Sequence, residues 1–387
     1  MNKKIKFSVL ALACSIMLSA CGGGGGEDKE AAKPDPTPPK TDSVTYLGKD
    51  TFIMTAVDGD TFSIVFDRNN RTASISPLNT LYGVEETQNI PVKITDSGLG
   101  ITIYTSVNEE RNSGRPWFEI ITSPGGDEII GQVEIASLQS NVIGTNLQIN
   151  RTSELPIYGA YNGVAIEAIS RTAQKELVDF GIKNEGGQLS YCDNGVYASN
   201  VCTGVEYRAF LSSTFGGMAR LMLNVDGRTV NFAYLLLARN GSEYSLILDR
   251  VNNANGEVVY GTGFAAPAKN FALTSFAKSS ICVKHDASGG SMLTLREDGT
   301  YTEAMYDSKL KPLGETSGSL AFNMALSKYG IISAPGFVSF VEGGGSLPAN
   351  GGQKVPRALN FSKNMMVLAQ EGSHSLAVCR SDTLALQ

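Results

Sequence analysis

Side chains that could act as general acids or bases are scarce in this sequence. Histidine, the commonest such residue near neutral pH, occurs only at His285 and His374. Asp286 and Glu371 are near them in the sequence, so these two segments could supply ligands for a metal ion. The alternative, which we favour, is that both histidines are polar residues in loops at strand ends.

Motifs of nucleophilic, cofactor-dependent and calcium-binding proteins are incomplete. The segment K-H-D-A-S-G-G-S at 284–291 contains Ser, His and Asp, but residues so close in sequence rarely converge on one point. The G-T-G-F-A-A segment at 261–266 mimics a dinucleotide loop, yet Pro267 follows it and no long helix does. The D-G-D segment at 58–60 has too few ligands for an EF-hand loop, so we expect a turn there.

Acidic and aromatic residues give no clear site either. The pairs Glu85-Glu86 and Glu109-Glu110 are predicted loop carboxylates, and a sequence cannot show them converging as a glycosidase pair. Trp117, the single tryptophan, lies in R-P-W-F-E-I-I and is predicted to pack in a strand core, with ligand stacking as the alternative. We therefore expect no catalytic residue, no cofactor and no metal.

The first twenty residues have the pattern of a secretory signal peptide. Lys3, Lys4 and Lys6 precede an apolar stretch from 7 to 18. That stretch holds about a dozen residues, whereas a membrane-spanning helix needs about 20. We therefore expect residues 1–20 to direct export and then to be removed.

The end of this segment, L-S-A-C at 18–21, resembles the lipobox of bacterial lipoproteins. The resemblance implies cleavage before Cys21 and a diacylglyceryl group on its sulfur, which would anchor the chain on a membrane. An ordinary signal peptide with a chance cysteine is the alternative. Gly22 stands where an Asp would tend to retain a lipoprotein in the inner membrane, so the resemblance implies the outer membrane, on its periplasmic or cell-surface face.

A tether is predicted between the anchor and the folded body. Residues 21–43 contain the lipidated cysteine, five consecutive glycines and four prolines, without an apolar pattern. Such a segment buries too little apolar surface to offset its conformational entropy, so we expect disorder. Its reach would be about 25 Å as a flexible coil and about 70 Å when fully extended. The glycine run is similar to the tethers of surface-displayed lipoproteins.

Apart from Cys14 and Cys21, four cysteines remain for the folded body. These are Cys192, Cys202, Cys282 and Cys379. An even number in an oxidising compartment predicts two disulfides, and three pairings are possible. We favour Cys192–Cys202, which closes a short loop, and Cys282–Cys379, which encloses the C-terminal block. A zinc site is the alternative, but C-x-x-C spacing is missing.

The body is predicted to be mainly β. Asp-Gly or Asn-Gly pairs, the strongest short hairpin signal, stand between apolar runs at 58–59, 226–227, 240–241 and 298–299. The hairpins at 52–68 and 234–250 match without a gap, and 364–380 is a looser copy. This match indicates duplication of a β-module, with convergence of half-buried hairpins as the alternative.

One amphipathic helix is predicted at about 165–180. Apolar residues there recur every three or four positions, which is typical of one helix face, and Gly181 would cap it. The apolar positions are Ile166, Ile169, Ala173, Leu177 and Phe180.

We therefore expect tandem antiparallel β-sandwich or lipocalin-like barrel modules with this one helix, after the tether. The predicted blocks are 44–154, 155–272 with the helix, and 277–387 with the Cys282–Cys379 bond.

Charge and composition narrow the expected partners. The sequence carries 32 basic and 38 acidic side chains, a net charge of −6, and loss of three lysines with the signal peptide leaves −9. That balance disfavours nucleic acid, which needs basic surface. We expect a non-enzymatic cell-envelope lipoprotein that contacts the membrane through its lipid and a protein or glycan through its loops. The alternatives are an envelope polysaccharide hydrolase using Asp or Glu, and an assembly accessory of an outer-membrane secretion or pilus system.

Overall fold

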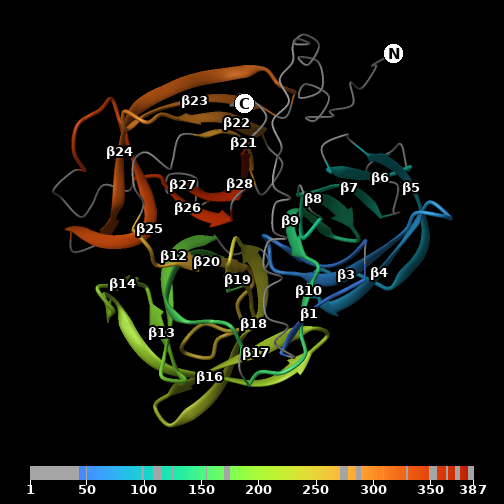
Figure 1. The fold of residues 1–387 in the computed structure, drawn as a ribbon, viewed down its shortest axis with the longest axis horizontal. Coiled ribbons are helices and arrows are strands. Elements are labelled where there is room, and N and C mark those ends of the chain that lie inside the picture. Colours follow the sequence, from blue (N-terminus) through green and yellow to red (C-terminus); the bar gives the residue numbers. More distant parts are fainter. Residues whose placement is uncertain are drawn as a thin grey trace, which may run out of the picture.

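The computed structural model places three barrels of β-strands around a shared centre (Figure 1). It describes residues 43–381, except for positions 49, 97–99, 108–115, 124–125, 154, 170–174, 271–277, 285–288, 308, 328–329, 348–354, 363–364 and 371–374. Each barrel is closed by eight antiparallel strands that pair in chain order, apart from one small insertion. The mainly β prediction is confirmed, and of the two predicted architectures the barrel is the one present.

The first barrel lies within the predicted block 44–154. Its strands are β2 (Thr51–Ala56), β3 (Thr61–Asp67), β4 (Thr72–Asn79), β5 (Thr87–Asp96), β6 (Thr102–Ser106), β7 (Trp117–Thr122), β8 (Glu128–Ile135) and β9 (Leu138–Thr145). β2 pairs with β9 to close the ring. Aromatic and branched side chains, including Phe66, Tyr104 and Phe118, fill the interior.

The second barrel lies within the predicted block 155–272. Its strands are β11 (Gly159–Glu167), β12 (Glu176–Glu185), β13 (Gln188–Asp193), β16 (Val205–Phe215), β17 (Met218–Val225), β18 (Arg228–Asn240), β19 (Glu243–Arg250) and β20 (Thr262–Pro267). β14 (Tyr197–Ala198) and β15 (Val201–Cys202) form a small ribbon between β13 and β16.

A two-stranded ribbon from outside that block completes the second barrel. β1 (Val44–Tyr46) pairs with β10 (Leu147–Ile149), and their side chains join the core of the second barrel. Leu155 and Ile157 belong to the same core. The chain on both sides of the first barrel therefore packs on the second barrel, a contact that the sequence-based division of the blocks did not include.

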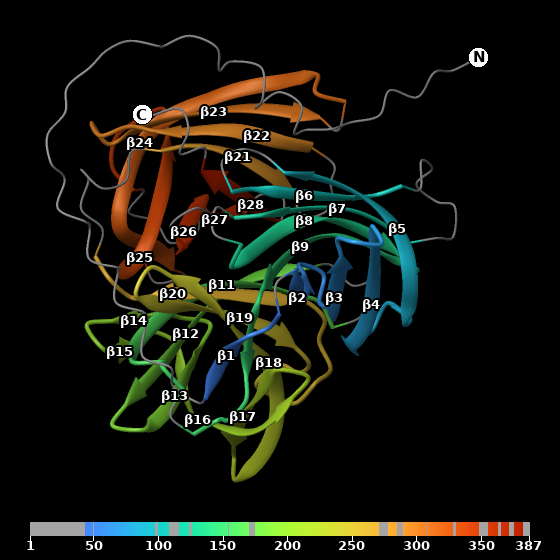
Figure 2. The same cartoon turned by 45° about the vertical axis from the view of Figure 1, so that its right-hand side comes forward.

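The third barrel lies within the predicted block 277–387. Its strands are β21 (Lys278–Lys284), β22 (Gly289–Leu295), β23 (Thr300–Asp307), β24 (Pro312–Ser327), β25 (Gly330–Glu342), β26 (Arg357–Ser362), β27 (Met365–Gln370) and β28 (Ser375–Ser381). β21 pairs with β28 and closes the ring, with Cys282 opposite Cys379. Figure 2 shows the long strands β24 and β25 along one side of this barrel.

Local turn chemistry explains the hairpins. Asp226 and Gly227 join β17 to β18 with φ values of 49° and 76°, as a two-residue hairpin turn requires. Gly59 and Gly299 also have positive φ in the predicted hairpins. At Asn240-Gly241 the turn lies one residue later than predicted, because Asn240 still pairs with Glu243.

The three matching hairpins take different positions in their barrels. The segment 52–68 contains the first and second strands of the first barrel, and 234–250 contains the sixth and seventh of the second. Segment 364–380 contains the seventh and eighth strands of the third barrel. The matching hairpins therefore do not occupy equivalent places in the three barrels.

The predicted helix at 165–180 is wrong. Its described parts are the end of β11 and the start of β12, which pair with each other, Ile166 opposite Leu177. β11 is buried on both faces, because other barrels cover its outer side, so its apolar run lacks the alternation of a half-buried strand. Gly181 lies within β12, where a Cβ would come within 2.6 Å of the Tyr197 ring.

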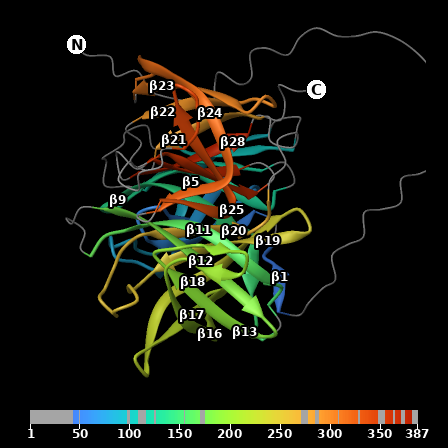
Figure 3. The same cartoon turned by 90° about the vertical axis from the view of Figure 1, so that its left-hand side faces the viewer.

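The three barrels share one apolar core on their outer surfaces. Ile53 of the first barrel, Phe264 of the second and Phe361 of the third belong to the same buried cluster. The rings of Phe264 and Phe361 meet edge to face, with centroids 5.7 Å apart. Because each barrel buries outward-facing side chains against the other two, the barrels form one body (Figure 3).

Polar bonds cross every pair of barrels at this junction. Thr262 donates to the carbonyl of Ala56 at 2.5 Å, which joins the second barrel to the first. The amide of Asn141 donates to the carbonyl of Val283 at 3.1 Å, which joins the first to the third. The remaining seam joins the second and third barrels through Asp179 of β12, which accepts from Nε of Arg357 at 2.9 Å.

Candidate functional site

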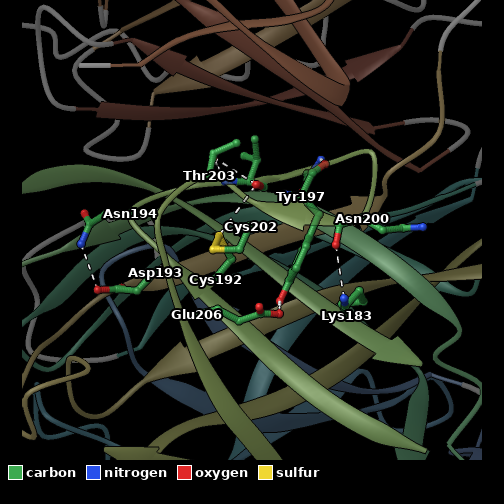
Figure 4. Close-up of a disulfide and its surroundings, with 11 residues drawn as sticks. Lys183, Cys192, Asp193, Asn194, Tyr197, Asn200, Cys202, Thr203 and Glu206 are labelled. Carbon is green, nitrogen blue, oxygen red and sulfur yellow. Dashed lines mark hydrogen bonds between the residues drawn. A yellow bond between two sulfur atoms is a disulfide. The ribbon is translucent and has the colours of Figure 1, made fainter. Parts of the chain in front are cut away.

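A disulfide fixes the segment that runs from the end of β13 to the start of β16, which we call the disulfide loop (residues 192–206). Cys192 and Cys202 are bonded, with Cα atoms 5.5 Å apart, as the sequence favoured. Two glycines bring the ends of the loop together, since a Cβ on Gly195 would lie 2.3 Å from the nitrogen of Gly204. The bond and this close approach hold the base of the loop narrow (Figure 4).

Tyr197 anchors the centre of the disulfide loop. Its side chain is buried against β12, and its hydroxyl donates to Oε1 of Glu206 at 2.9 Å. Asn162 of β11 bonds both backbone groups of Tyr197, accepting from its nitrogen at 2.7 Å and donating to its oxygen at 3.0 Å. The same amide reaches the carbonyl of Pro335 in the third barrel at 2.9 Å. The loop is thereby tied to two barrels.

Two apolar side chains on this fixed frame are exposed, one in β15 and one at the start of β16, opposite Asp193. Val201 is 67% exposed and Val205 is 54% exposed. Asn200, with a φ of 67°, turns the chain between them and Tyr197, and its carbonyl accepts from Lys183 at 3.2 Å. An exposed apolar surface of fixed shape can bind a partner with little loss of conformational entropy.

The second disulfide lies inside the third barrel. Cys282 and Cys379 are bonded across β21 and β28, and both are buried in that barrel's core. The register continues to Lys284 opposite Ala377, as the predicted bond requires. His285 and His374 lie outside the described residues, as do Asp286, Glu371 and the Glu109-Glu110 pair. Cys21 and its tether also lie outside them.

The other residues singled out from sequence do not form a site. Trp117 begins β7, the segment 261–266 contributes β20, and Glu85 and Glu86 are exposed. The D-G-D segment at 58–60 makes the predicted turn, in which the nitrogen of Gly59 bonds the carbonyl of Ala56. Among the residues that the structure describes, no cluster of three or more His, Cys, Asp or Glu side chains could hold a metal ion.

A buried arginine stands in the second barrel, which the sequence did not predict. The guanidinium of Arg250 pairs with Glu167 and lies over the Phe232 ring, 4.0 Å from its centroid. Burial raises the pKa of Glu167, and the arginine opposes that shift. Both side chains lie in or against the packed barrel core, where an ion pair needs this mutual compensation.

Two buried carboxyl groups lie at the seams between barrels. Asp249 of the second barrel accepts from the amide of Asn79 in the first at 2.7 Å, and burial raises the pKa of Asp249 well above its usual range. Glu128 of the first barrel accepts from the hydroxyl of Ser362 in the third at 2.9 Å. Within the described residues, the second oxygen of each carboxyl group has no hydrogen-bond partner.

We predict that Glu128→Gln removes part of the pH dependence of stability. Burial raises the pKa of Glu128 from 4.5 to about 7, against the hydrogen bond from Ser362. Stability from the protonated group is therefore complete below pH 4.5 and is lost as pH rises towards 7, by about 3 kcal/mol at most. Urea unfolding at pH 5 and pH 8 should show a smaller loss in Glu128→Gln than in the unchanged chain. Equal losses would contradict the prediction, and Glu85→Gln at an exposed position is the control.

Comparison of this chain with known proteins found similar solved structures. No family model and no curated protein sequence matches it. Among solved structures it is similar to isotype 1 transferrin binding protein B from serogroup B Neisseria meningitidis, at 12% identity and a TM-score of 0.20. That alignment covers 84% of this chain and 65% of the other, so this chain spans just under two thirds of that protein's length.

A second similar structure is a protein of unknown function from the DUF3598 family of Nostoc punctiforme. Identity is 9% and the TM-score is 0.17, with 86% of this chain and 93% of the other covered. Both likenesses are too distant to assign a function. In the part of the chain that the structure describes, no helix is long and apolar enough to cross a membrane.

Proposed function

We propose that this chain is a lipid-anchored binding protein of the bacterial cell envelope, held on the outer membrane through Cys21. It binds a protein or glycan of the envelope and catalyses no reaction. The disulfide loop is the binding element. The observation that carries the proposal is that this loop exposes Val201 and Val205 while a disulfide and the buried Tyr197 hold its shape.

The barrel interiors support binding on an outer surface. Each of the three interiors contains a cluster of buried side chains, among them Phe118 in the first barrel, Phe232 in the second and Phe340 in the third. A lipocalin-like carrier needs space for its ligand inside the barrel. Packed interiors instead suit a scaffold that positions its loops.

A polysaccharide hydrolase is less well supported. Its two carboxyl groups would have to meet where a sugar chain can enter. Asp60 and Asp249 lie close enough to interact electrostatically, but both are fully buried. These two carboxyl groups are therefore out of reach of a polymer.

Photo-cross-linking in cells tests the role of the loop. A photoreactive phenylalanine analogue at Val205 is expected to give one discrete adduct with an envelope component. The adduct should disappear when Val201→Asp is added, because a charge at that position disrupts an apolar contact. The same analogue at Leu310, which is exposed on the third barrel, is the control. Absence of an adduct at Val205, or an adduct that Val201→Asp leaves unchanged, would contradict the proposal.

A further inference from the structure

The chain that leads to the anchor enters the body at one end of the second barrel. The carbonyl of Ser43 accepts from the nitrogen of Asn150 at 2.9 Å, and β1 then runs along β10. Val44, Ile149 and Ile157 cover this end of the barrel from inside. The segment that leads to the anchor therefore joins the body at the end of the second barrel that these side chains cover.

Exposed tyrosines surround this entry point. Tyr46, at the end of β1, is 48% exposed, and Tyr158, just before β11, is 74% exposed. The hydroxyl of Tyr46 accepts from Arg239 at 2.5 Å, and Arg239 pairs across the hairpin with Tyr244. Tyrosine combines an apolar ring with a polar hydroxyl and is enriched where a membrane meets water.

Basic side chains accompany these rings. Arg151, next to the Ser43 contact, is exposed, and Lys269 is 67% exposed and pairs with Glu243 at 2.7 Å. The backbone of Ala268 bonds that of Ala160, which places Lys269 beside the strand that follows Tyr158. We call the surface formed by Tyr46, Arg151, Tyr158, Arg239 and Lys269 the tether face.

We propose that the tether face lies on the membrane that holds the anchor, with the tyrosine rings at the level of the lipid head groups and the basic side chains near their phosphates. The inference rests on the proposed lipid anchor at Cys21. The tether face has the chemistry of a contact at the membrane–water interface, in which aromatic rings and cations act together.

The length of the tether makes a weak contact sufficient. Twenty-two positions separate Cys21 from Ser43, which gives a flexible chain a root-mean-square reach of about 25 Å. A tether of that length holds the face near the membrane at an effective concentration of the order of 1 mM. A contact whose dissociation constant in solution is only millimolar is then populated on the membrane. In this orientation β22 of the third barrel faces away from the membrane (Figures 1 and 2).

Tryptophan quenching by brominated lipid tests this orientation. The full acylated chain carrying Trp117→Phe would be reconstituted in vesicles of brominated phosphatidylcholine and phosphatidylglycerol. One new tryptophan would be introduced at a time, as Tyr46→Trp, Tyr158→Trp or, as the control, Met292→Trp. Met292 is 50% exposed on β22, far from β1 in each view.

We expect loss of emission for the tryptophans at 46 and 158, and unchanged emission at 292. Vesicle-bound chains without quenching at 46 and 158, or with equal quenching at 292, would overturn the tether face and leave the anchor intact. Emission at 46 that responds to soluble polysaccharide and not to lipid would assign the face to glycan and also overturn it. Failure of the acylated chain to float with the vesicles would contradict the anchor, and with it the tether face.

Discussion

Replacing both Cys282 and Cys379 with alanine is expected to lower the free energy of unfolding by about 4–5 kcal/mol. The two residues are 97 positions apart, and their bond joins the first and last strands of the third barrel. Without it, β21 and β28 keep only their backbone pairing and can separate more easily. Urea unfolding followed by hydrogen exchange in the third barrel would measure both the loss and its location.

The other disulfide provides the matched control. Cys192 and Cys202 are only 10 positions apart, for which the chain-entropy relation gives about 2.7 kcal/mol. The loss of unfolding free energy in the Cys192→Ala/Cys202→Ala variant should therefore be about 2 kcal/mol smaller than in the Cys282→Ala/Cys379→Ala variant. Non-reducing peptide mapping should join 282 to 379. A peptide that joins Cys282 to Cys192 or Cys202 would refute both the pairing and the third barrel as a closed unit.

Truncating Phe361, at the junction between barrels, should lower the free energy of unfolding by about as much as loss of the Cys282–Cys379 bond. Phe361 is fully buried and meets Phe264 of the second barrel edge to face. Phe361→Ala removes that contact and leaves a cavity between two barrels, at an expected cost of about 3–5 kcal/mol. Calorimetry should show a lower melting temperature for this variant.

Two further variants separate an effect at the junction from a general loss of packing. Phe361→Leu, which keeps most of the volume, should cost clearly less than Phe361→Ala. Phe118→Ala, inside the first barrel, removes a side chain of the same size without touching the junction. If Phe361→Ala cost less than 1 kcal/mol, the shared core would not hold the barrels together as described.

Short-range features of this fold were accessible from the sequence because they depend on a few neighbouring residues. Asp226 and Gly227 predict a hairpin turn, since both positions need positive φ, and the structure has it. The short spacing of Cys192 and Cys202 favoured their pairing among the three possible ones, and the structure has this bond. These signals were enough to predict antiparallel β-modules.

Features that depend on contacts between barrels were not accessible. The run from Gly163 to Ile166 is buried on both faces by the interior of one barrel and the outside of others, so its periodicity resembled a helix. Glu128 was not singled out from the sequence, because it is buried at the seam where Ser362 of the third barrel donates to it. In Asp249-Arg250, charged residues at the end of an apolar strand were the one available signal.

The central claim is that this chain is anchored by lipid on Cys21, and metabolic labelling with a clickable fatty acid tests it most directly. The unchanged chain should take up the label and sediment with the outer-membrane fraction. Cys21→Ser should take up none and should accumulate as the precursor or in soluble form. Labelling of the Cys21→Ser chain, or an unlabelled wild-type chain, would contradict the account.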